Sequence, residues 1–274
     1  MMRGACWALA LVLGVPVFAK EPAAVDKSVY HLFHPTPPNL LREMSTDRPD
    51  VTESAYTVDA GHFQVEMDLA SFSRDRHTVE RNGGSRSWSF LSANFKLGLT
   101  NRMDFQVVAP LYNRVSSGPE GFGDLTFRLK TNLWGNDGGP TALAIMPFFK
   151  IPTAADGLGN DEVEAGLIIP FAAELPAGWG FGAMLELDWL ADEDGGHHGV
   201  VVTSVTFSHA IIGDLGGYVE FTSELSEESD WVATFNLGAT YALTENVQLD
   251  AGINLGLTRA ADDLNPFVGL SIRF

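Results

Sequence analysis

Residues 229–243, SDWVATFNLGATYAL, decide the fold class, because apolar residues alternate there with polar or small ones. The odd-numbered positions from Trp231 to Tyr241 are all apolar, whereas Thr234, Asn236 and Thr240 lie between them. Successive side chains of a β-strand point to opposite faces, so this run predicts a strand with one apolar and one polar face. A helix would repeat its apolar residues about every 3.6 positions instead.

The same alternation extends outward from this run over most of the chain. Residues 245–258, ENVQLDAGINLGLT, repeat it closely, and weaker copies follow residue 60. Together they predict about twelve strands, starting near residues 61, 86, 101, 121, 140, 161, 178, 197, 214, 229, 245 and 263. Short turns alternate with longer polar loops between these strands. An even number of strands with this loop pattern predicts an antiparallel up-and-down transmembrane β-barrel.

Charged residues on the polar face favour a membrane barrel over a soluble sandwich or a lipocalin-like barrel. A soluble barrel buries apolar side chains inside, whereas ionised groups need water or partners. A wet lumen with lipid outside supplies both. The charged side chains expected to face the lumen are Glu66, Asp68, Lys96, Asp104, Arg128, Lys130, Glu186, Asp188, Glu220 and Asp250.

Aromatic spacing supports the membrane barrel. Trp179 and Trp189 share one face of a predicted strand, ten residues apart, and Trp231 and Tyr241 do the same on another strand. Ten residues of a tilted strand rise about 25 Å, which matches the apolar band between two aromatic girdles. Trp88 does not fit this girdle, because its position in the alternation matches the polar face of its strand.

The first 60 residues differ from the rest. Residues 1–19 carry Arg3, an apolar run and a small-residue cleavage site, which predicts a signal peptide too short to span a membrane as a helix. Its removal would also remove Cys6, the one cysteine. Residues 20–60 are rich in proline and predict an extended segment that acts as a plug or a latch. Residues 61–274 are expected to form the barrel, without an internal linker.

The composition excludes two classes of protein. The chain has 274 residues, 35 Asp and Glu against 17 Lys and Arg, and a formal net charge of −18. Nucleic acid is excluded as a partner, because binding phosphates needs a basic patch. With 45% hydrophobic residues, the chain is also too apolar to be a disordered protein.

Asp47, Arg48 and Asp50 form a charged cluster just before the first predicted strand. They could line the lumen and control its opening, or they could form a latch in which Arg48 pairs with a barrel carboxylate. The lumen itself leaves two alternatives open. It could be a modest pore for small cations or neutral solutes, since twelve strands lie between filled and open barrels, or it could be closed by salt bridges.

Two other kinds of site, a metal site and a hydrolase site, have partial matches in the sequence. Residues 192–198, DEDGGHH, resemble a divalent-metal cluster, although an external loop of this composition is usually just solvated, and we expect no metal. Ser208 and His209 are the best candidates for the Ser–His pair of a lipid-hydrolysing enzyme, but neighbouring residues of a strand point to opposite faces and cannot form such a pair. No G-x-S-x-G or HExxH sequence is present. We expect neither an enzyme nor a cofactor.

Three motifs carry a family resemblance. They are residues 45–50, STDRPD, followed by Thr52, residues 61–66, GHFQVE, and residues 121–125, GFGDL. On these residues the chain resembles, over about residues 45 to 274, the outer-membrane transporters associated with the meta-cleavage pathway of phenol degradation. The resemblance implies a β-barrel transporter of the outer membrane. The in-phase terminal Phe274 similarly resembles the signal that the barrel-assembly machinery reads.

These expectations combine into one functional hypothesis. The protein is expected to admit small solutes, hydrophobic or aromatic ones among them, through the outer membrane of a Gram-negative bacterium. Outer-membrane lipid, lipopolysaccharide and the barrel-assembly machinery would be its partners. The alternative is a structural or surface-recognition barrel without transport, and a lipid-hydrolysing barrel is a more distant one.

Overall fold

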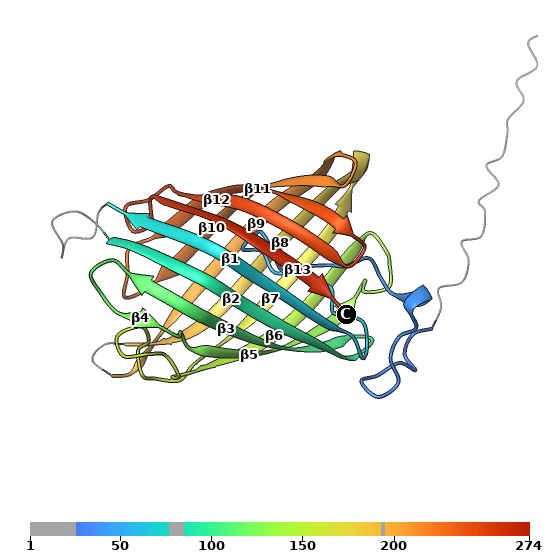
Figure 1. Ribbon diagram of the computed structural model, residues 1–274, viewed down its shortest axis with the longest axis horizontal. Coiled ribbons are helices and arrows are strands. Elements are labelled where there is room, and N and C mark those ends of the chain that lie inside the picture. The colour runs from blue at the N-terminus through green and yellow to red at the C-terminus, as the bar shows by residue number, and fades with distance from the viewer. Residues whose placement is uncertain (1–25, 77–84, 193–194) are drawn as a thin grey trace, which may run out of the picture.

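A closed antiparallel β-barrel forms the molecule (Figure 1). The computed structural model describes residues 26–76, 85–192 and 195–274, so the expected signal peptide lies outside the described residues. The long strands are β1 Phe63–Asp75, β2 Ser85–Thr100, β3 Met103–Val115, β5 Leu125–Trp134, β6 Thr141–Ile151, β7 Glu164–Leu175, β8 Trp179–Ala191, β9 His197–Ile212, β10 Leu215–Ser226, β11 Val232–Thr244, β12 Val247–Gly256 and β13 Leu264–Arg273. A short strand, β4 Glu120–Gly121, pairs with β3. The described helices are two short 3-10 turns, η1 Pro38–Leu40 and η2 Pro176–Gly178.

Pairing of the first and last strands closes the ring. β1 pairs with β2 on one side and with β13 on the other, and each remaining long strand pairs with its two neighbours. The up-and-down barrel predicted from the alternation is therefore confirmed. Each of the twelve long strands described starts within four residues of its predicted position. Within residues 26–76, 85–192 and 195–274, no helix is long and apolar enough to cross a membrane.

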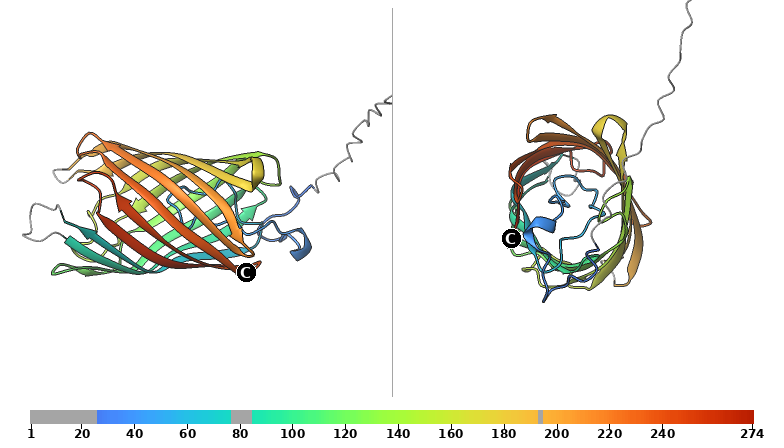
Figure 2. Two further views of the ribbon diagram at one scale, coloured as in Figure 1. Left: turned by 90° about the horizontal axis from the view of Figure 1, so that it is seen from above. Right: turned by 90° about the vertical axis from the view of Figure 1, so that its right-hand side faces the viewer.

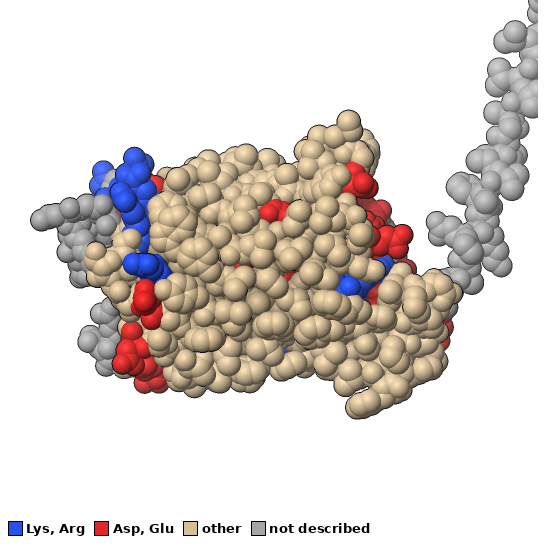
Figure 3. Space-filling model, viewed as in Figure 1, with Lys and Arg blue, Asp and Glu red and all other residues tan. Residues whose placement is uncertain are grey.

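The two faces of the strands differ as the alternation requires. In β11, Phe235 and Leu237 are 39% and 38% exposed on the outside, whereas Asn236 between them is fully buried in the lumen. Figure 3 shows the result on one face of the molecule, where charged residues gather at the two ends of the barrel and a broad, nearly uncharged band lies between them. A band of this kind suits contact with hydrocarbon.

The girdle residues expected from the sequence lie at the ends of this band. Trp179 and Tyr241 are exposed near the rim where the C-terminus lies, and Trp189 and Trp231 are exposed near the opposite rim. The Trp231 indole N–H donates a hydrogen bond of 2.9 Å to the Ser223 hydroxyl, and Trp189 stacks on His197. Each of these two rings thus combines an apolar surface with a polar neighbour, as interfacial aromatic residues do.

The expectation for Trp88 was wrong. Trp88 is 42% exposed and packs against Phe72, with ring centroids 4.6 Å apart, and against Phe90. The strict alternation breaks between the lumenal Lys96 and Trp88, because Leu91 has a positive φ of 55°. This irregularity shifts the remainder of β2 by one position, so Trp88 belongs to the outer aromatic surface after all.

The N-terminal segment enters the barrel (Figure 2, right). Residues before Arg42 lie at the rim near the C-terminus, where the Leu32 amide donates to the Leu99 carbonyl. Residues 42–60, which we call the plug, run inside the ring of strands. The plug contributes no strand to the barrel, so its backbone polar groups need partners on the lumenal wall.

Candidate functional site

Lumenal side chains bind the backbone of the plug directly. The amides of Asp47, Thr52 and Val58 donate to the carboxylates of Glu66 (2.9 Å), Glu220 (2.7 Å) and Asp104 (2.9 Å) respectively. Glu66 and Asp104 come from β1 and β3, on either side of β2, and Glu220 comes from the distant β10. An extended segment without a ladder of its own leaves such amides free, so the charged lumen replaces a neighbouring strand as their partner.

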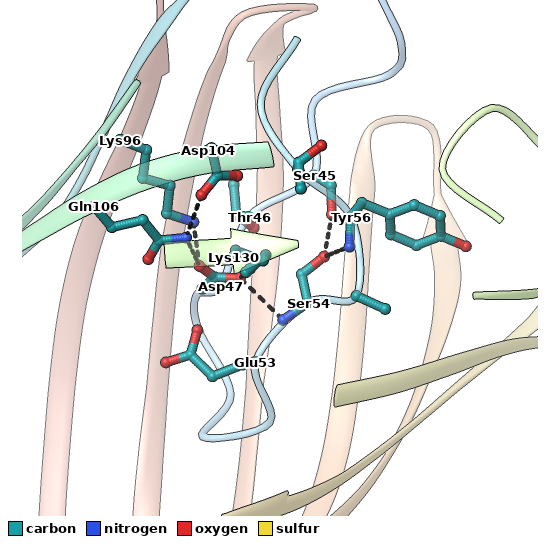
Figure 4. Close-up of polar contacts among 12 residues, drawn as sticks. Ser45, Thr46, Asp47, Glu53, Ser54, Tyr56, Lys96, Asp104, Gln106 and Lys130 are labelled. Atoms are coloured by element: carbon teal, nitrogen blue, oxygen red, sulfur yellow. Dashed lines mark hydrogen bonds and ion pairs between the residues drawn. The ribbon is translucent and has the colours of Figure 1, made fainter. Parts of the chain in front are cut away.

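Asp47 is the centre of the largest charged cluster (Figure 4). Its carboxylate forms ion pairs with Lys96 of β2 and Lys130 of β5, and it accepts a 2.9 Å hydrogen bond from the Ser54 amide. Lys96 also pairs with Glu66. Burial opposes the ionisation of Asp47, but the ammonium groups of Lys130 and Lys96 outweigh it and hold the pKa of this carboxyl below its usual value.

Asp104 completes this cluster without an ion pair to the plug. It accepts 2.9 Å hydrogen bonds from the Gln106 amide nitrogen and from the Val58 backbone amide. The side chains of Lys96, Asp104 and Lys130 are at most 3% exposed. Charges buried this deeply are tolerated only with close partners, so the plug and this wall depend on each other.

Arg48 connects the plug to the seam of the barrel. Its guanidinium donates to Asp68 of β1 at 2.7 Å and to Asp250 of β12 at 2.7 and 3.3 Å. Between these strands, it lies over the Phe267 ring and the backbone of Gly269 in β13. A Cβ atom at Gly269 would be 2.1 Å from the guanidinium, so only glycine leaves room for this arrangement.

Glu53 of the plug also forms an ion pair, with Arg128 of β5 at 2.5 Å. Beyond it, Glu186 and Asp188 lie two positions apart on the same face of β8. Neither makes an ion pair with the plug among the residues that the structure describes. The structure therefore brings eight of the ten expected lumenal charges into direct hydrogen bonds or ion pairs with the plug: Glu66, Asp68, Lys96, Asp104, Arg128, Lys130, Glu220 and Asp250.

Glu220 differs from these ion pairs because all its hydrogen-bond donors are neutral. It accepts from the backbone amides of Val51 and Thr52, the Thr52 hydroxyl and the Asn236 amide, at 2.6 to 3.0 Å. Asp50 lies next to it in the plug. Burial, reinforced by the nearby Glu220 carboxylate, raises the pKa of Asp50 to about 8. Of the expected cluster Asp47–Arg48–Asp50, only the first two residues form ion pairs in the described parts of the chain.

The plug is also fixed at the rim, by residues that the sequence alone did not single out. The Arg42 backbone amide donates to Asp59, and its guanidinium forms an ion pair with Asp59 and donates to Asn101 and Asp137. Arg273, near the C-terminus, donates to the Arg42 carbonyl at 2.8 Å. No local sequence pattern marks Arg42 or Asp59 as part of this contact, because several of their partners lie far away along the chain.

Apolar contacts hold the plug against β6. Ala55 packs against Ala142 and Ala144 of β6, and all three are fully or almost fully buried. Three cavities remain around the plug, with volumes of about 670, 360 and 560 Å³. The first two share Gln248 in their walls, and the third lies at the rim beside Tyr56.

Neither alternative site acquires support. Ser208 lines the 360 Å³ cavity, while the ring of His209 is bound to the Ala177 carbonyl at 3.1 Å. In the loop whose composition resembles a divalent-metal cluster, His198 contacts Asp192 at 2.5 Å, and residues 193–194 lie outside the described residues. Within the described residues, no group of three or more His, Cys, Asp or Glu is arranged around a metal-sized space.

Phe274 closes the chain at the seam. Its amide donates to the Phe63 carbonyl at 2.7 Å, and its carbonyl accepts from the Phe63 amide at 3.3 Å. The ring is 68% exposed and lies 6.3 Å from the Phe63 ring. An exposed terminal ring in phase with the outer face is accessible to a partner, although the role in assembly remains a prediction.

A closed barrel of this size with a charged, plugged lumen has the outer-membrane channel and porin-like fold. The family model described as "Putative MetA-pathway of phenol degradation" matches residues 46–274, and the chain belongs to this family. The family resemblance seen in the sequence motifs is thereby confirmed. No curated protein sequence matches the chain.

Two solved structures share the fold. An outer membrane channel from Pseudomonas putida F1 superposes with a TM-score of 0.63 at 15% identity, over 84% of this chain and 100% of that one. The NanC porin superposes with a TM-score of 0.53 at 12% identity, over 75% of this chain and 98% of that one. At these identities, the similarity establishes the barrel fold that the two proteins share with this chain.

Proposed function

We propose that this protein is an outer-membrane channel for small solutes, closed by its own N-terminal plug and opened when the plug shifts. The observation that carries this proposal is the combination of an apolar exterior with a charged lumen whose only occupant among the described residues is a non-covalently held segment. A closure built from ion pairs and hydrogen bonds can be reversed, whereas a lumen filled by the strands' own side chains cannot.

The fold shared with an outer membrane channel and a porin supports this function, and so does the family to which the chain belongs. The outer membrane of a Gram-negative bacterium is the corresponding location, with outer-membrane lipid and lipopolysaccharide around the barrel and Phe274 as the contact of the assembly machinery. The uncharged outer band supports this location. We propose no enzymatic role, because Ser208 and His209 point to opposite faces of β9.

A structural barrel without transport is the second candidate. The buried ion pairs of Asp47, Arg48 and Glu53 favour it, because they would make the plug a permanent filling. The two functions differ in one property: in a channel, weakening the plug increases the flow of ions or solutes, whereas in a permanently filled barrel it only lowers stability.

Planar-bilayer recordings of purified, refolded protein test this difference. We expect stepwise conductance from the wild type and a larger open probability from Arg48→Gln, which loses both of the carboxylate contacts. Arg76→Gln is the matched control, because the Arg76 side chain is 62% exposed and pairs with Asp263 at a strand end. Silence from wild type and Arg48→Gln, with both barrels folded by heat-modifiable migration, would overturn the channel. Release of fatty acid from phospholipid by the same sample would instead support an enzyme.

A further inference from the structure

The two sides of the plug are held by different chemistry. Towards β12, β1, β2 and β5, the plug forms ion pairs through Asp47, Arg48 and Glu53. Towards β9 and β10, it makes hydrogen bonds with Ser204, Tyr218 and Glu220, in which every donor is uncharged. Separating the second set pulls no pair of opposite charges apart, whereas separating the first set would leave buried ammonium and guanidinium groups without their carboxylates.

Two neighbouring cavities lie on this second side. The cavity of about 670 Å³ begins at the rim, between residues 41–44 and the β11–β12 turn. The cavity of about 360 Å³ continues inward, between residues 46–50 of the plug and strands β8 to β12. Gln248 lines both cavities. The third cavity lies at the rim, between Tyr56 of the plug and residues 135–139 of the β5–β6 turn.

Two glycines contribute to the strand wall of the inner cavity. Gly180 of β8 and Gly216 of β10 line it in place of larger residues, and neither has a positive φ. A Cβ atom at Gly180 would lie 2.4 Å from the Ser208 hydroxyl, and one at Gly216 would lie 2.9 Å from the Thr240 hydroxyl, so the glycines leave room for these two polar groups on the neighbouring strands. The remaining strand residues that line this cavity include Ser208, Thr240 and Gln248, whose hydroxyl and amide groups are uncharged hydrogen-bonding partners.

The inner cavity ends where Val51 and Thr52 bind Glu220. Tyr218 lines the cavity from the same strand as Glu220 and lies over Gly238 and Gly252, where no Cβ would fit. Its hydroxyl contacts the Pro49 carbonyl at 3.4 Å. Four residues of the plug, 49–52, therefore separate the inner cavity from the far half of the lumen through hydrogen bonds alone.

We propose that solutes cross between the plug and the β8–β12 wall, and that residues 49–52 lift from Glu220 while the ion-paired side of the plug stays in place. This inference rests on the proposed channel function and specifies its route. The strand wall of the inner cavity presents hydroxyls, the Gln248 amide and bare backbone, and the Arg48 guanidinium beside it is already neutralised by Asp68 and Asp250. Charged side chains, among them Glu43 and Glu245, line the wider outer cavity instead. The route consequently suits small, uncharged, hydrogen-bonding solutes.

Thiol labelling during bilayer recording tests the route. Removal of residues 1–19 would leave no cysteine, so Ser208→Cys and Thr240→Cys each place a single thiol beside the inner cavity. Asn132→Cys is the control, because Asn132 is 1% exposed and binds the Ala55 carbonyl on the ion-paired side. We expect a methanethiosulfonate reagent to lower the conductance of both cavity variants about twofold or more and to leave the control unchanged. Two cavity positions protect the test against one variant that fails to fold.

The outcomes separate the route from the function. Conductance that persists in Ser208→Cys and Thr240→Cys, whether or not mass spectrometry shows them labelled, overturns the route and leaves the channel standing. Blockage of Asn132→Cys to the same extent also overturns it. Absence of conductance from every folded variant, labelled or not, overturns the channel itself. In liposome swelling, an uncharged pentose should enter faster than a carboxylate or an ammonium compound of similar size, and equal rates would overturn the solute class.

Discussion

Replacing Asp47 by Asn is the sharpest perturbation of the plug. The substitution keeps the shape of the side chain but removes the one carboxylate that pairs with both Lys96 and Lys130. Lys96 would retain Glu66, whereas Lys130, which is fully buried, would lose its only ion-pair partner within the described residues. The variant would therefore leave an uncompensated ammonium group inside the barrel.

The size of the effect follows from the cost of such a charge. Removing one partner of a buried ion pair costs about 3–5 kcal/mol. Since about 1.4 kcal/mol changes an equilibrium tenfold, the docked plug should lose two to four orders of magnitude relative to the undocked one. The cost falls on docking, because the barrel ladder does not include Asp47.

Two measurements report on docking. Open probability in planar bilayers should rise strongly in Asp47→Asn, and the backbone amides of Thr52 and Val58 should lose protection from hydrogen exchange. The double variant Asp47→Asn/Lys130→Met is the control, because removing both charges should restore much of the docking. An unchanged open probability and unchanged protection in Asp47→Asn would refute the reasoning, and so would a double variant as open as the single one.

Three further predictions concern separate features. Because burial and Glu220 raise the pKa of Asp50 from 3.8 to about 8 in the docked plug, docking binds a proton, so conductance should rise with pH between about 4 and 8, and Asp50→Asn should flatten this dependence; a pH profile identical to that of the wild type would contradict it. Gly269→Ala should displace Arg48 and increase conductance, whereas Gly199→Ala, with nothing within 4 Å, should not; equal conductance of the two variants in bilayers would refute the role of the glycine. Deleting Phe274 should reduce the heat-modifiable barrel recovered from outer membranes, and full recovery, measured by gel migration, would exclude an assembly signal there.

The barrel could be predicted from the sequence because lipid and water impose the alternation strand by strand. A register slip of one residue would turn every apolar side chain of a strand into the lumen. The alternation is therefore strict in runs such as residues 229–243. The face of Trp88 was predicted wrongly because one irregular residue, Leu91, shifts the alternation. The amino-acid pattern around Leu91 does not mark this irregularity, which lies in the backbone conformation.

The lumenal charges could be predicted individually but their pairing could not. Asp47 and Lys130 are 83 positions apart, and only the curvature of the closed ring brings them together. Arg48 was expected to pair with some barrel carboxylate, but the sequence did not specify Asp250, 202 positions away. The hydrogen bonds between the plug and Glu220 could not be predicted for a further reason. Backbone amides donate them, and every sequence contains backbone amides.

Arg48 has a consequence for how the molecule is made. Its guanidinium reaches from Asp68 in β1 across Gly269 in β13 to Asp250 in β12, so it spans the junction between the first and the last hairpins of the chain. All of these bonds can exist together only after the final strand has found the first. The plug can therefore dock fully only after the last strand has paired with the first. In an unclosed sheet, Arg48, Asp68 and Asp250 would remain solvated and unpaired.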